Sequence, residues 1–124
     1  MELIYKEESY TIIGRCMEVW KTLGYGFSEV VYKDAMELEF MEHNIPYLRE
    51  QELSVKYKSS RLKHKFRSDF TMYDSIIVEI KANEAPAFSE NFEQVLNYLR
   101  ATDFKLGLIV NFGKKKLEYK RIVV

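Results

Sequence analysis

The most informative pattern in the chain is a run of apolar residues that carries two charges. From position 76 to position 82, every residue is apolar except Glu79 and Lys81. Side chains alternate across a strand, so these two share one face with Ile77, opposite a fully apolar face. A run this apolar is typical of a strand in the middle of a sheet, where an unpaired charge is costly. Glu79 and Lys81 therefore either reach water at the end of the strand or form a site.

Apolar residues at helical spacing predict three helices. The first spans about residues 7–23, and the glycines within residues 24–26 end it. The second begins at Ser28, a good N-cap residue, and continues to about residue 43. The third spans about residues 88–100. The side chains expected on the buried faces of these helices are Ile12, Ile13, Cys16, Met17, Trp20, Leu23, Val31, Tyr32, Ala35, Met36, Leu38, Phe40, Phe88, Phe92, Val95, Leu96 and Leu99.

Alternating and apolar runs predict strands on both sides of the third helix. Three of them, at residues 47–57, 62–73 and 76–82, precede that helix. Two more follow it, at residues 105–112 and 116–124. The order ααβββαββ predicts an α/β fold with a central mixed β-sheet flanked by helices. The length of 124 residues is typical of a single domain, 1–124.

Charge is balanced over the whole chain but unevenly distributed. Residues 1–52 carry five basic and eleven acidic side chains, whereas residues 53–124 carry fourteen basic and eight acidic ones. Between positions 53 and 68 there are six basic residues and no acidic one: Lys56, Lys58, Arg61, Lys63, Lys65 and Arg67. Such asymmetry is typical of a face that binds a polyanion, although a solvated strand rim explains it equally well.

Other features of the sequence exclude several classes of protein. The single Cys16 excludes an internal disulfide, and no cluster of Cys and His indicates zinc. The acidic N-terminal residues lack the apolar core of a signal peptide. The longest apolar runs are too short to span a bilayer. We therefore expect a cytoplasmic protein that has no membrane partner.

Asp69, Glu79 and Lys81 form the pattern Asp, nine intervening residues, Glu-x-Lys. Two carboxylates that converge on one point bind a hard divalent cation such as Mg²⁺. Such an ion lowers the pKa of bound water and neutralises charge on a phosphoryl group. A neighbouring lysine can orient or deprotonate the water, or stabilise the charge of the transition state. These parts suit phosphodiester hydrolysis, but the motif alone is a weak signal because alternating charge is common on half-exposed strands.

The connection between residues 73 and 76 provides a geometric test of this site. A two-residue turn at Asp74 and Ser75 would pair Asp69 with Ile80, on the wrong face of the sheet. A three-residue connection would instead pair Asp69 with Glu79. The site therefore requires an odd-length connection or a bulge.

Several blocks of the sequence resemble one protein family. Gly26-Phe27-Ser28-Glu29-Val30-Val31-Tyr32 is similar to the Gly-x-x-Glu-x-x-Tyr signature of the GxxExxY family. Further similar blocks are Arg67-Ser68-Asp69-Phe70, Val78-Glu79-Ile80-Lys81-Ala82, Gln94-Val95-Leu96-Asn97-Tyr98-Leu99 and Leu108-Ile109-Val110-Asn111-Phe112-Gly113. The resemblance covers nearly the whole chain, with Ser68 standing where alanine is usual. The family is placed in the PD-(D/E)XK nuclease-like superfamily, which implies a restriction-endonuclease-like core. The Gln-x-x-x-Tyr helix resembles that of RecB-like members.

The resemblance also implies roles for individual residues. Asp69, Glu79 and the main-chain carbonyl of Ile80 would hold Mg²⁺ or Mn²⁺, and Lys81 would be the catalytic lysine. Glu29 would be a further ligand or would orient a metal-bound water, although its position in the first turn of a helix also suits the helix macrodipole. The remaining implied residues would line the site or contact substrate: Gln94, Tyr98, Tyr32, Lys63, Lys65 and Arg67.

These observations favour a divalent-metal-dependent nuclease that hydrolyses DNA by metal-activated water. The basic strand residues would hold the phosphate backbone, with weak sequence specificity. The alternative is a non-catalytic or partner-dependent nucleic-acid-binding accessory protein that keeps the nuclease fold. The near-neutral pI of about 6.7 and the small size favour a homodimer or a protein partner. A purely structural interaction module does not explain the complete set of polar site residues.

Overall fold

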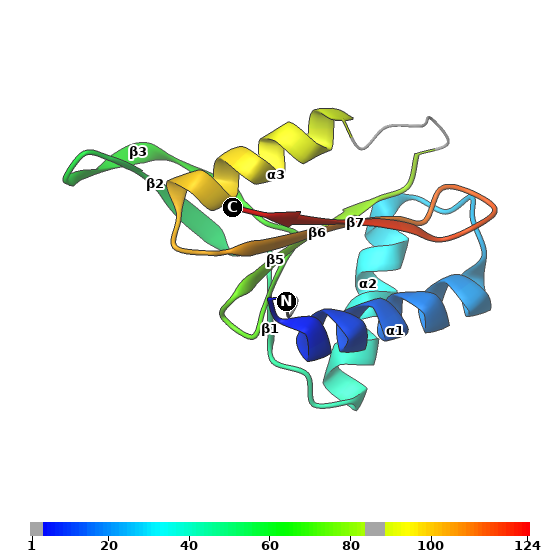
Figure 1. Cartoon of the computed structure of the whole chain (residues 1–124). Helices are drawn as coiled ribbons and strands as arrows, with labels where there is room; N and C mark the ends of the chain where they lie inside the picture. Colours follow the sequence, from blue (N-terminus) through cyan, green and yellow to red (C-terminus); the bar gives the residue numbers. More distant parts are fainter. Residues whose placement is uncertain (1–3, 84–88) are drawn as a thin grey trace.

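The computed structural model describes residues 4–83 and 89–124 (Figure 1). The helices are α1 (Lys6–Leu23), α2 (Glu29–Glu42) and α3 (Ser89–Ala101). The strands are β1 (Tyr47–Arg49), β2 (Glu52–Tyr57), β3 (Ser60–Arg67), β4 (Phe70–Met72), β5 (Ile76–Lys81), β6 (Leu106–Asn111) and β7 (Glu118–Val123). The predicted α/β class and the three helices are confirmed. Phe88, expected at the start of the third helix, lies outside the described residues.

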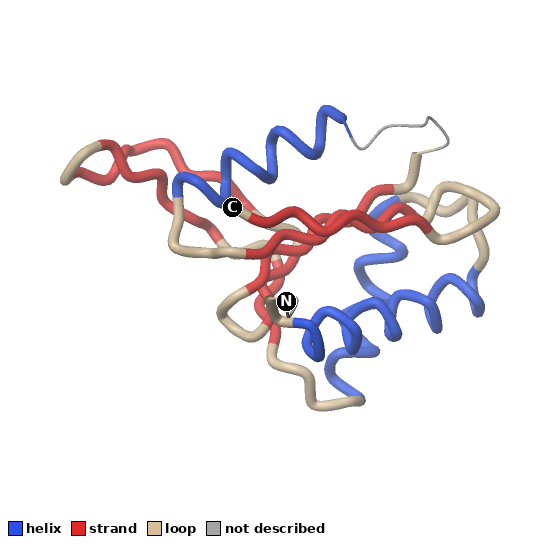
Figure 2. The backbone as a smooth tube through the Cα atoms, in the orientation of Figure 1, coloured by secondary structure: helices blue, strands red, loops and turns tan. Residues whose placement is uncertain are grey.

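A mixed five-stranded sheet forms the centre of the fold. Its strand order is β1-β4-β5-β6-β7, and β2 pairs only with β3 in a separate two-stranded sheet. β5 and β6 are parallel, whereas the other neighbours in the main sheet are antiparallel. Figure 2 shows α1 and α2 on one side of the main sheet and α3 on the other. The predicted central mixed sheet with flanking helices is therefore confirmed. None of the described helices is long and apolar enough to cross a membrane.

The two longest expected strands are each divided, and this is the main difference from the sequence prediction. Glu50 has a φ of 55°, which ends the extended conformation between β1 and β2. The break between β3 and β4 lies beside it. The backbone N–H of Glu50 donates to the carbonyl of Asp69 at 2.9 Å, and that of Ser68 donates to the carbonyl of Gln51 at 3.2 Å. As a result β2 and β3 leave the main sheet together and project from it as a hairpin (Figure 1).

The connection between β4 and β5 has three residues. Tyr73 and Asp74 have φ values of 55° and 52°, in the left-handed region. The connection pairs Met72 with Ile76, and the antiparallel register continues to the pair of Phe70 and Val78. The odd-length connection that a real site requires is therefore confirmed.

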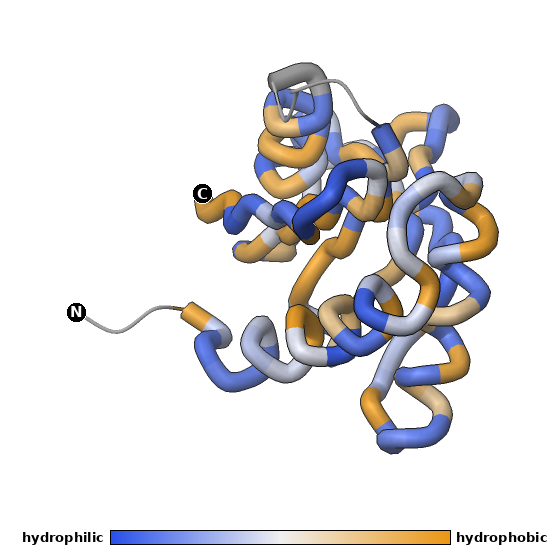
Figure 3. The backbone as a smooth tube through the Cα atoms, turned by 90° about the vertical axis from the view of Figure 1, so that its right-hand side faces the viewer, coloured by the Kyte–Doolittle hydropathy of each residue, from blue (hydrophilic) through white to orange (hydrophobic). Residues whose placement is uncertain are grey.

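Two apolar clusters pack on opposite faces of the main sheet. The larger cluster joins the apolar face of β5, which includes Ile76, Val78 and Ile80, to α1 and α2. The second joins Ile77 to α3 and to the base of the β2–β3 hairpin. Figure 3 shows hydrophilic and hydrophobic residues interleaved along the helices, as expected for helices with one buried face. The predicted division of β5 into two faces is confirmed.

The helix faces differ from prediction at two positions. Met17 is 50 % exposed and Leu38 is 58 % exposed, although both were expected in the core. In α1 the buried side chains are Ser9, Ile12, Cys16 and Val19, so the stripe passes beside Met17. In α2 the buried side chains are Tyr32, Lys33, Met36 and Phe40, which places Leu38 on the outer face.

Gly113 stands where the chain after β6 crosses the end of β5. A Cβ at this position would overlap the backbone nitrogen and oxygen of Asn83. Asn111 holds the same crossing, because its Oδ1 accepts hydrogen bonds from the N–H groups of Asn83 at 3.0 Å and Gly113 at 2.9 Å. Its Nδ2 donates to the carbonyl of Asn83 at 2.9 Å. This contact fixes the end of the strand that carries Glu79 and Lys81.

We expect Gly113→Ala to lower the free energy of unfolding by about 1–3 kcal/mol, because the backbone of Ala82 and Asn83, directly after β5, would have to shift. Urea denaturation followed by circular dichroism measures the change. Gly14→Ala is the matched control, since it lies in α1 with open space around it and should stabilise the helix by about 0.5–1 kcal/mol. Equal changes of stability in the two variants would contradict the importance of the crossing.

Candidate metal centre

Asp69 and Glu79 meet at the point where β4 stops covering β5. Continuing the β4–β5 register by one residue from the pair of Phe70 and Val78 sets Asp69 opposite Glu79, on the same face. Because β4 begins only at Phe70, its pairing with β5 ends at Val78 and does not reach Ile80. The side chain of Asp69 takes the place of a backbone partner for Ile80. Its Oδ2 accepts a hydrogen bond from the N–H of Ile80 at 2.7 Å. This bond fixes the Asp69 carboxylate against the strand that carries Glu79.

Glu79 is a buried carboxylate with little to compensate its charge. The residue is 6 % exposed, and its Oε1 has no hydrogen-bond partner among the described residues. Burial, followed by the negative charge of Asp69, raises the pKa of Glu79 to about 9, and the positive charge of Lys81 opposes this only in part. The site therefore favours either a proton or a cation at Glu79.

The donor set suits a hard divalent cation. Mg²⁺ and Mn²⁺ prefer oxygen ligands, and here the buried Glu79 carboxylate, with one oxygen free of hydrogen bonds, adjoins the partly buried Asp69 carboxylate. A bound cation would favour the charged form of Glu79 and so offset both the burial and the repulsion from Asp69 that raise its pKa. Within residues 4–83 and 89–124, however, no three Asp, Glu, His or Cys side chains gather into one metal-binding group. The residues thus fit a centre built on two carboxylates, completed by main-chain oxygen and water.

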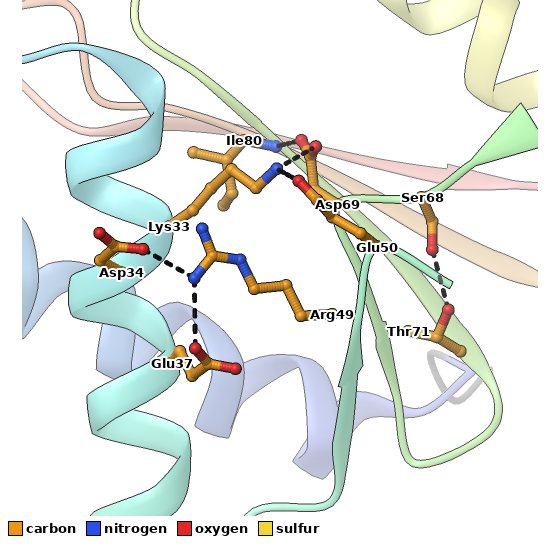
Figure 4. A network of polar contacts seen from close by, with 9 residues as sticks. All are labelled: Lys33, Asp34, Glu37, Arg49, Glu50, Ser68, Asp69, Thr71 and Ile80. Carbon is orange, nitrogen blue, oxygen red and sulfur yellow. Dashed lines mark hydrogen bonds and ion pairs between the residues drawn. The ribbon is translucent and has the colours of Figure 1, made fainter. Parts of the chain in front are cut away.

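Lys33 also reaches this centre, which the sequence pattern did not indicate. Its Nζ lies 3.1 Å from Asp69 Oδ1 and 2.8 Å from Glu50 Oε1 (Figure 4). Burial lowers the pKa of Lys33, but the hydrogen bonds and charges of Glu50 and Asp69 outweigh it and hold the pKa above its ordinary value. Lys33 is therefore a charged lysine whose partners come from the two strand breaks.

Arg49 of β1 forms a second ion-pair network with α2, the helix that carries Lys33. Its Nη1 lies 2.7 Å from Asp34 Oδ1 and 3.2 Å from Glu37 Oε1, both on α2 (Figure 4). This network ties β1 to α2 but shares no residue with the centre. It therefore belongs to the packing of β1 against α2 and not to the centre.

Glu29 lies one helical turn before Lys33. Residues four apart in a helix lie on the same face, so Glu29 is on the face of α2 that carries Lys33. It is only partly buried, and the structure does not bring it into a three-carboxylate group with Asp69 and Glu79. Its role as a further ligand stays a prediction.

Tyr98 of α3 lies close enough to the centre for the charges of Glu79 and Asp69 to affect the pKa of its hydroxyl. Burial raises the pKa of Tyr98, and the negative charges of Glu79 and Asp69 raise it further. Its ring stacks on Phe66 with centroids 3.6 Å apart, which joins α3 to the base of the hairpin. Gln94 precedes Tyr98 by one helical turn on α3 and is exposed.

Lys81, at the end of β5, lies on the same strand face as Glu79.

Tyr32 has a different place from the one expected. It is fully buried, and its ring stacks on Phe112 with centroids 4.6 Å apart. Its hydroxyl donates to the carbonyl of Gly24 at 2.6 Å and accepts from the N–H of Phe27 at 3.3 Å. Tyr32 therefore has no surface to offer a substrate, and its contacts hold the loop before α2. The expectation of direct substrate contact is corrected for this residue.

The β2–β3 hairpin, which we call the basic hairpin, presents its cations to solvent. Lys63, Lys65 and Arg67 alternate along β3, and all three are exposed. Arg67 makes one ion pair with Glu52 of β2 at 3.2 Å. The hairpin joins the main sheet beside Asp69, so the basic surface begins next to the carboxylate pair.

Comparisons with known proteins identify the family and the fold. A sequence model described as the PD-(D/E)XK nuclease superfamily matches residues 6–122. No curated protein sequence matches the chain significantly. Among solved structures, the crystal structure of SSO0001 is similar with a TM-score of 0.57 and 16 % identity. The match covers 96 % of this chain and 59 % of SSO0001, so this chain spans about three fifths of that protein's length.

A second similar structure is that of LHK-Exo, an alkaline exonuclease from Laribacter hongkongensis. The TM-score is 0.55 and the sequence identity is 12 %, with 99 % of this chain and 72 % of that chain covered. At such low identity the two structural matches establish the fold alone. They agree with the predicted nuclease-like core.

Proposed function

The chain belongs to the PD-(D/E)XK nuclease superfamily, and from this premise we propose that it is a divalent-metal-dependent nuclease that hydrolyses phosphodiester bonds in DNA. The observation that carries the proposal is the meeting of Asp69 and Glu79 on one face, next to Lys81. A buried carboxylate beside a second, partly buried one that repels it is expensive in a purely structural role. Such a pair is expected where a divalent cation neutralises it.

Each residue of the centre has a proposed role. Asp69, Glu79 and the carbonyl of Ile80 would hold Mg²⁺ or Mn²⁺, which supplies Lewis-acid activation of water and neutralises phosphate charge. Lys81 would orient or deprotonate the attacking water, or stabilise the charge that develops on the phosphate. Glu29 would assist from the start of α2. Gln94 and Tyr98 would contact the substrate from α3.

The finer assignments are also part of the proposal. The Gly-x-x-Glu-x-x-Tyr block at residues 26–32 supports membership of the GxxExxY family. The match over residues 6–122 supports a single nuclease-like domain. Among the residues that the structure describes, no element provides base readout, so weak sequence specificity is expected. A second copy or another protein could extend the DNA-binding surface.

Cleavage of end-labelled DNA tests the function. Single-stranded, duplex and branched DNA are incubated with the purified chain and with Mg²⁺, Mn²⁺ or EDTA. We expect cleavage of at least one substrate with either metal and none with EDTA. If none of the three substrates is cleaved with either metal, a nuclease that acts alone on DNA is contradicted.

One observation favours a second candidate function. The ion pair of Lys33 with Asp69 places a cation on one of the two carboxylates, as in a fold that has no need of a metal. The chain would then be a nucleic-acid-binding accessory protein. Binding of DNA without cleavage under every metal would support this candidate.

In either case the basic hairpin is expected to contact the phosphate backbone. We expect Lys63→Ala, Lys65→Ala and Arg67→Ala combined to weaken DNA binding by about 10-fold or more and to lower the salt slope of log K by up to about 2–3. Fluorescence anisotropy at 50–200 mM salt measures both quantities. Lys115→Ala with Lys116→Ala is the control, since both are exposed outside the hairpin. Equal losses per charge removed in the two sets would show that only overall charge matters.

A further inference from the structure

Lys33 is a buried cation placed on one of the two carboxylates that a metal would use. The residue is 9 % exposed, and its Nζ contacts Asp69 Oδ1 at 3.1 Å. Both oxygens of Asp69 are therefore engaged, because Oδ2 accepts the N–H of Ile80 at 2.7 Å. The N–H is fixed in the backbone of β5, whereas the ammonium lies at the end of a flexible four-carbon chain. Of the two contacts, the one with Lys33 is the one that can yield.

A divalent cation at Asp69 would lie close to the Lys33 ammonium. The two positive charges would repel each other in a partly buried site, where screening by water is weak. Metal binding thus has to overcome the ion pair that is already present. Lys33 would be displaced from Asp69 but would keep its charge, because it has a second partner.

Glu50 is that second partner. Its Oε1 is 2.8 Å from Lys33 Nζ, closer than Asp69 is. Glu50 stays beside the centre because its backbone N–H donates to the carbonyl of Asp69 at 2.9 Å. Its side chain is 50 % exposed, so it can pair with Lys33 without a large desolvation cost. The strand break at Glu50 thus supplies an alternative position for the ammonium.

We propose that Lys33 competes with the divalent cation for Asp69, and that Glu50 holds the Lys33 ammonium when the metal binds. This inference rests on the proposed function, because it takes Asp69 as a metal ligand. Lys33 acts on the metal through Asp69, which makes it a positioning residue. It keeps the carboxylate paired in the metal-free protein and sets how much free metal the site requires.

Calorimetric titration with Mn²⁺ tests the competition without any activity assay. We expect Lys33→Met to bind Mn²⁺ about tenfold more tightly than the wild type, because the competing charge is gone. We expect Glu50→Gln to bind it about threefold more weakly, because Lys33 is then held by Asp69 alone. In the double variant, Glu50→Gln should have little further effect on Lys33→Met. General damage to the fold would instead weaken binding in both single variants.

Arg49→Met is the matched control, since it removes a cation paired with α2 carboxylates but does not contact Asp69. It should leave Mn²⁺ affinity within about twofold of the wild type. Asp69→Asn should abolish binding. If Asp69→Asn abolishes binding but Lys33→Met does not tighten it, the competition is wrong while the metal centre stands. If neither the wild type nor any variant binds Mn²⁺, the proposed function fails as well.

If Lys33→Met does not fold, Glu50→Gln still decides the question, because its half-exposed side chain lies at the surface. Unchanged or tighter Mn²⁺ binding by Glu50→Gln would overturn the role of Glu50. An equal loss from Glu50→Gln in the wild-type and Lys33→Met backgrounds would show a direct effect of its charge on the metal. That result would also overturn the transfer of Lys33.

Discussion

Lys81→Ala is expected to lower the rate of metal-dependent DNA cleavage by about 10²–10⁴-fold, the usual contribution of a general acid or base. Lys81 lies at the end of β5 on the face of Glu79 and is partly exposed. Its side chain makes no ion pair with another described residue, so its loss removes little structural support. DNA binding and the free energy of unfolding should therefore change little. Single-turnover cleavage with Mn²⁺ measures the effect.

Lys115→Ala removes an exposed lysine of the β6–β7 loop and is the control for charge alone. It should retain the wild-type rate within about twofold, since surface substitutions away from a site are usually mild. Cleavage that survives Lys81→Ala unchanged would exclude Lys81 from the chemistry. It would also indicate a contaminating nuclease if Asp69→Asn were equally active.

Glu79→Gln is expected to stabilise the metal-free protein while abolishing cleavage. The pKa of Glu79 is raised from its ordinary value of 4.5 to about 9, chiefly by burial and then by the charge of Asp69. Between these two values the folded state binds more protons than the unfolded state. The free energy of unfolding should therefore fall as pH rises through this window, by up to about 1.4 kcal/mol per pH unit. An amide at this position has no proton to lose, so Glu79→Gln should lose much of this dependence.

Urea denaturation in EDTA at pH 6 and pH 9 measures the difference. Relative to the wild type, Glu79→Gln should gain more stability at pH 9 than at pH 6. Glu93→Gln, an exposed position on α3, should follow the wild type at both values. If the difference in the free energy of unfolding between Glu79→Gln and the wild type is the same at pH 9 as at pH 6, a buried carboxyl in the metal-free centre is contradicted.

The sequence predicts the face of Glu79 and Lys81 because strand alternation is a local rule. If the connection between the two strands has an odd length, Asp69 lies on that same face. The three-residue connection before Ile76 meets this condition. The three helices were equally predictable from their spacing. These features depend on neighbours in the chain, so a single sequence contains enough information about them.

The strand breaks and Lys33 could not be predicted in this way. Polar runs at residues 49–52 and 67–69 interrupt the alternation around Glu50 and Ser68, but no glycine or proline there marks the points where the hairpin leaves the sheet. Because Lys33 meets Glu50 and Asp69 only through those breaks, its contacts depend on the complete fold. The signal that was available is the position of Lys33 itself, a charged residue beside Tyr32 on the inner side of α2.

Tyr32 shows the opposite difficulty. A family signature indicates that a residue matters, but not whether it does so through substrate or through packing. Full burial of the Tyr32 ring and the two hydrogen bonds of its hydroxyl favour packing. Its hydroxyl fixes the loop that leads into Glu29, so its effect on the centre would be indirect.

Anomalous diffraction from crystals soaked in Mn²⁺ tests the central claim that Asp69 and Glu79 form a metal centre. We predict an anomalous peak beside the two carboxylates, with the Lys33 ammonium moved toward Glu50, and no such peak in crystals of Asp69→Asn. Saturating Mn²⁺ that leaves no peak between Asp69 and Glu79, with Lys33 still on Asp69, would contradict it.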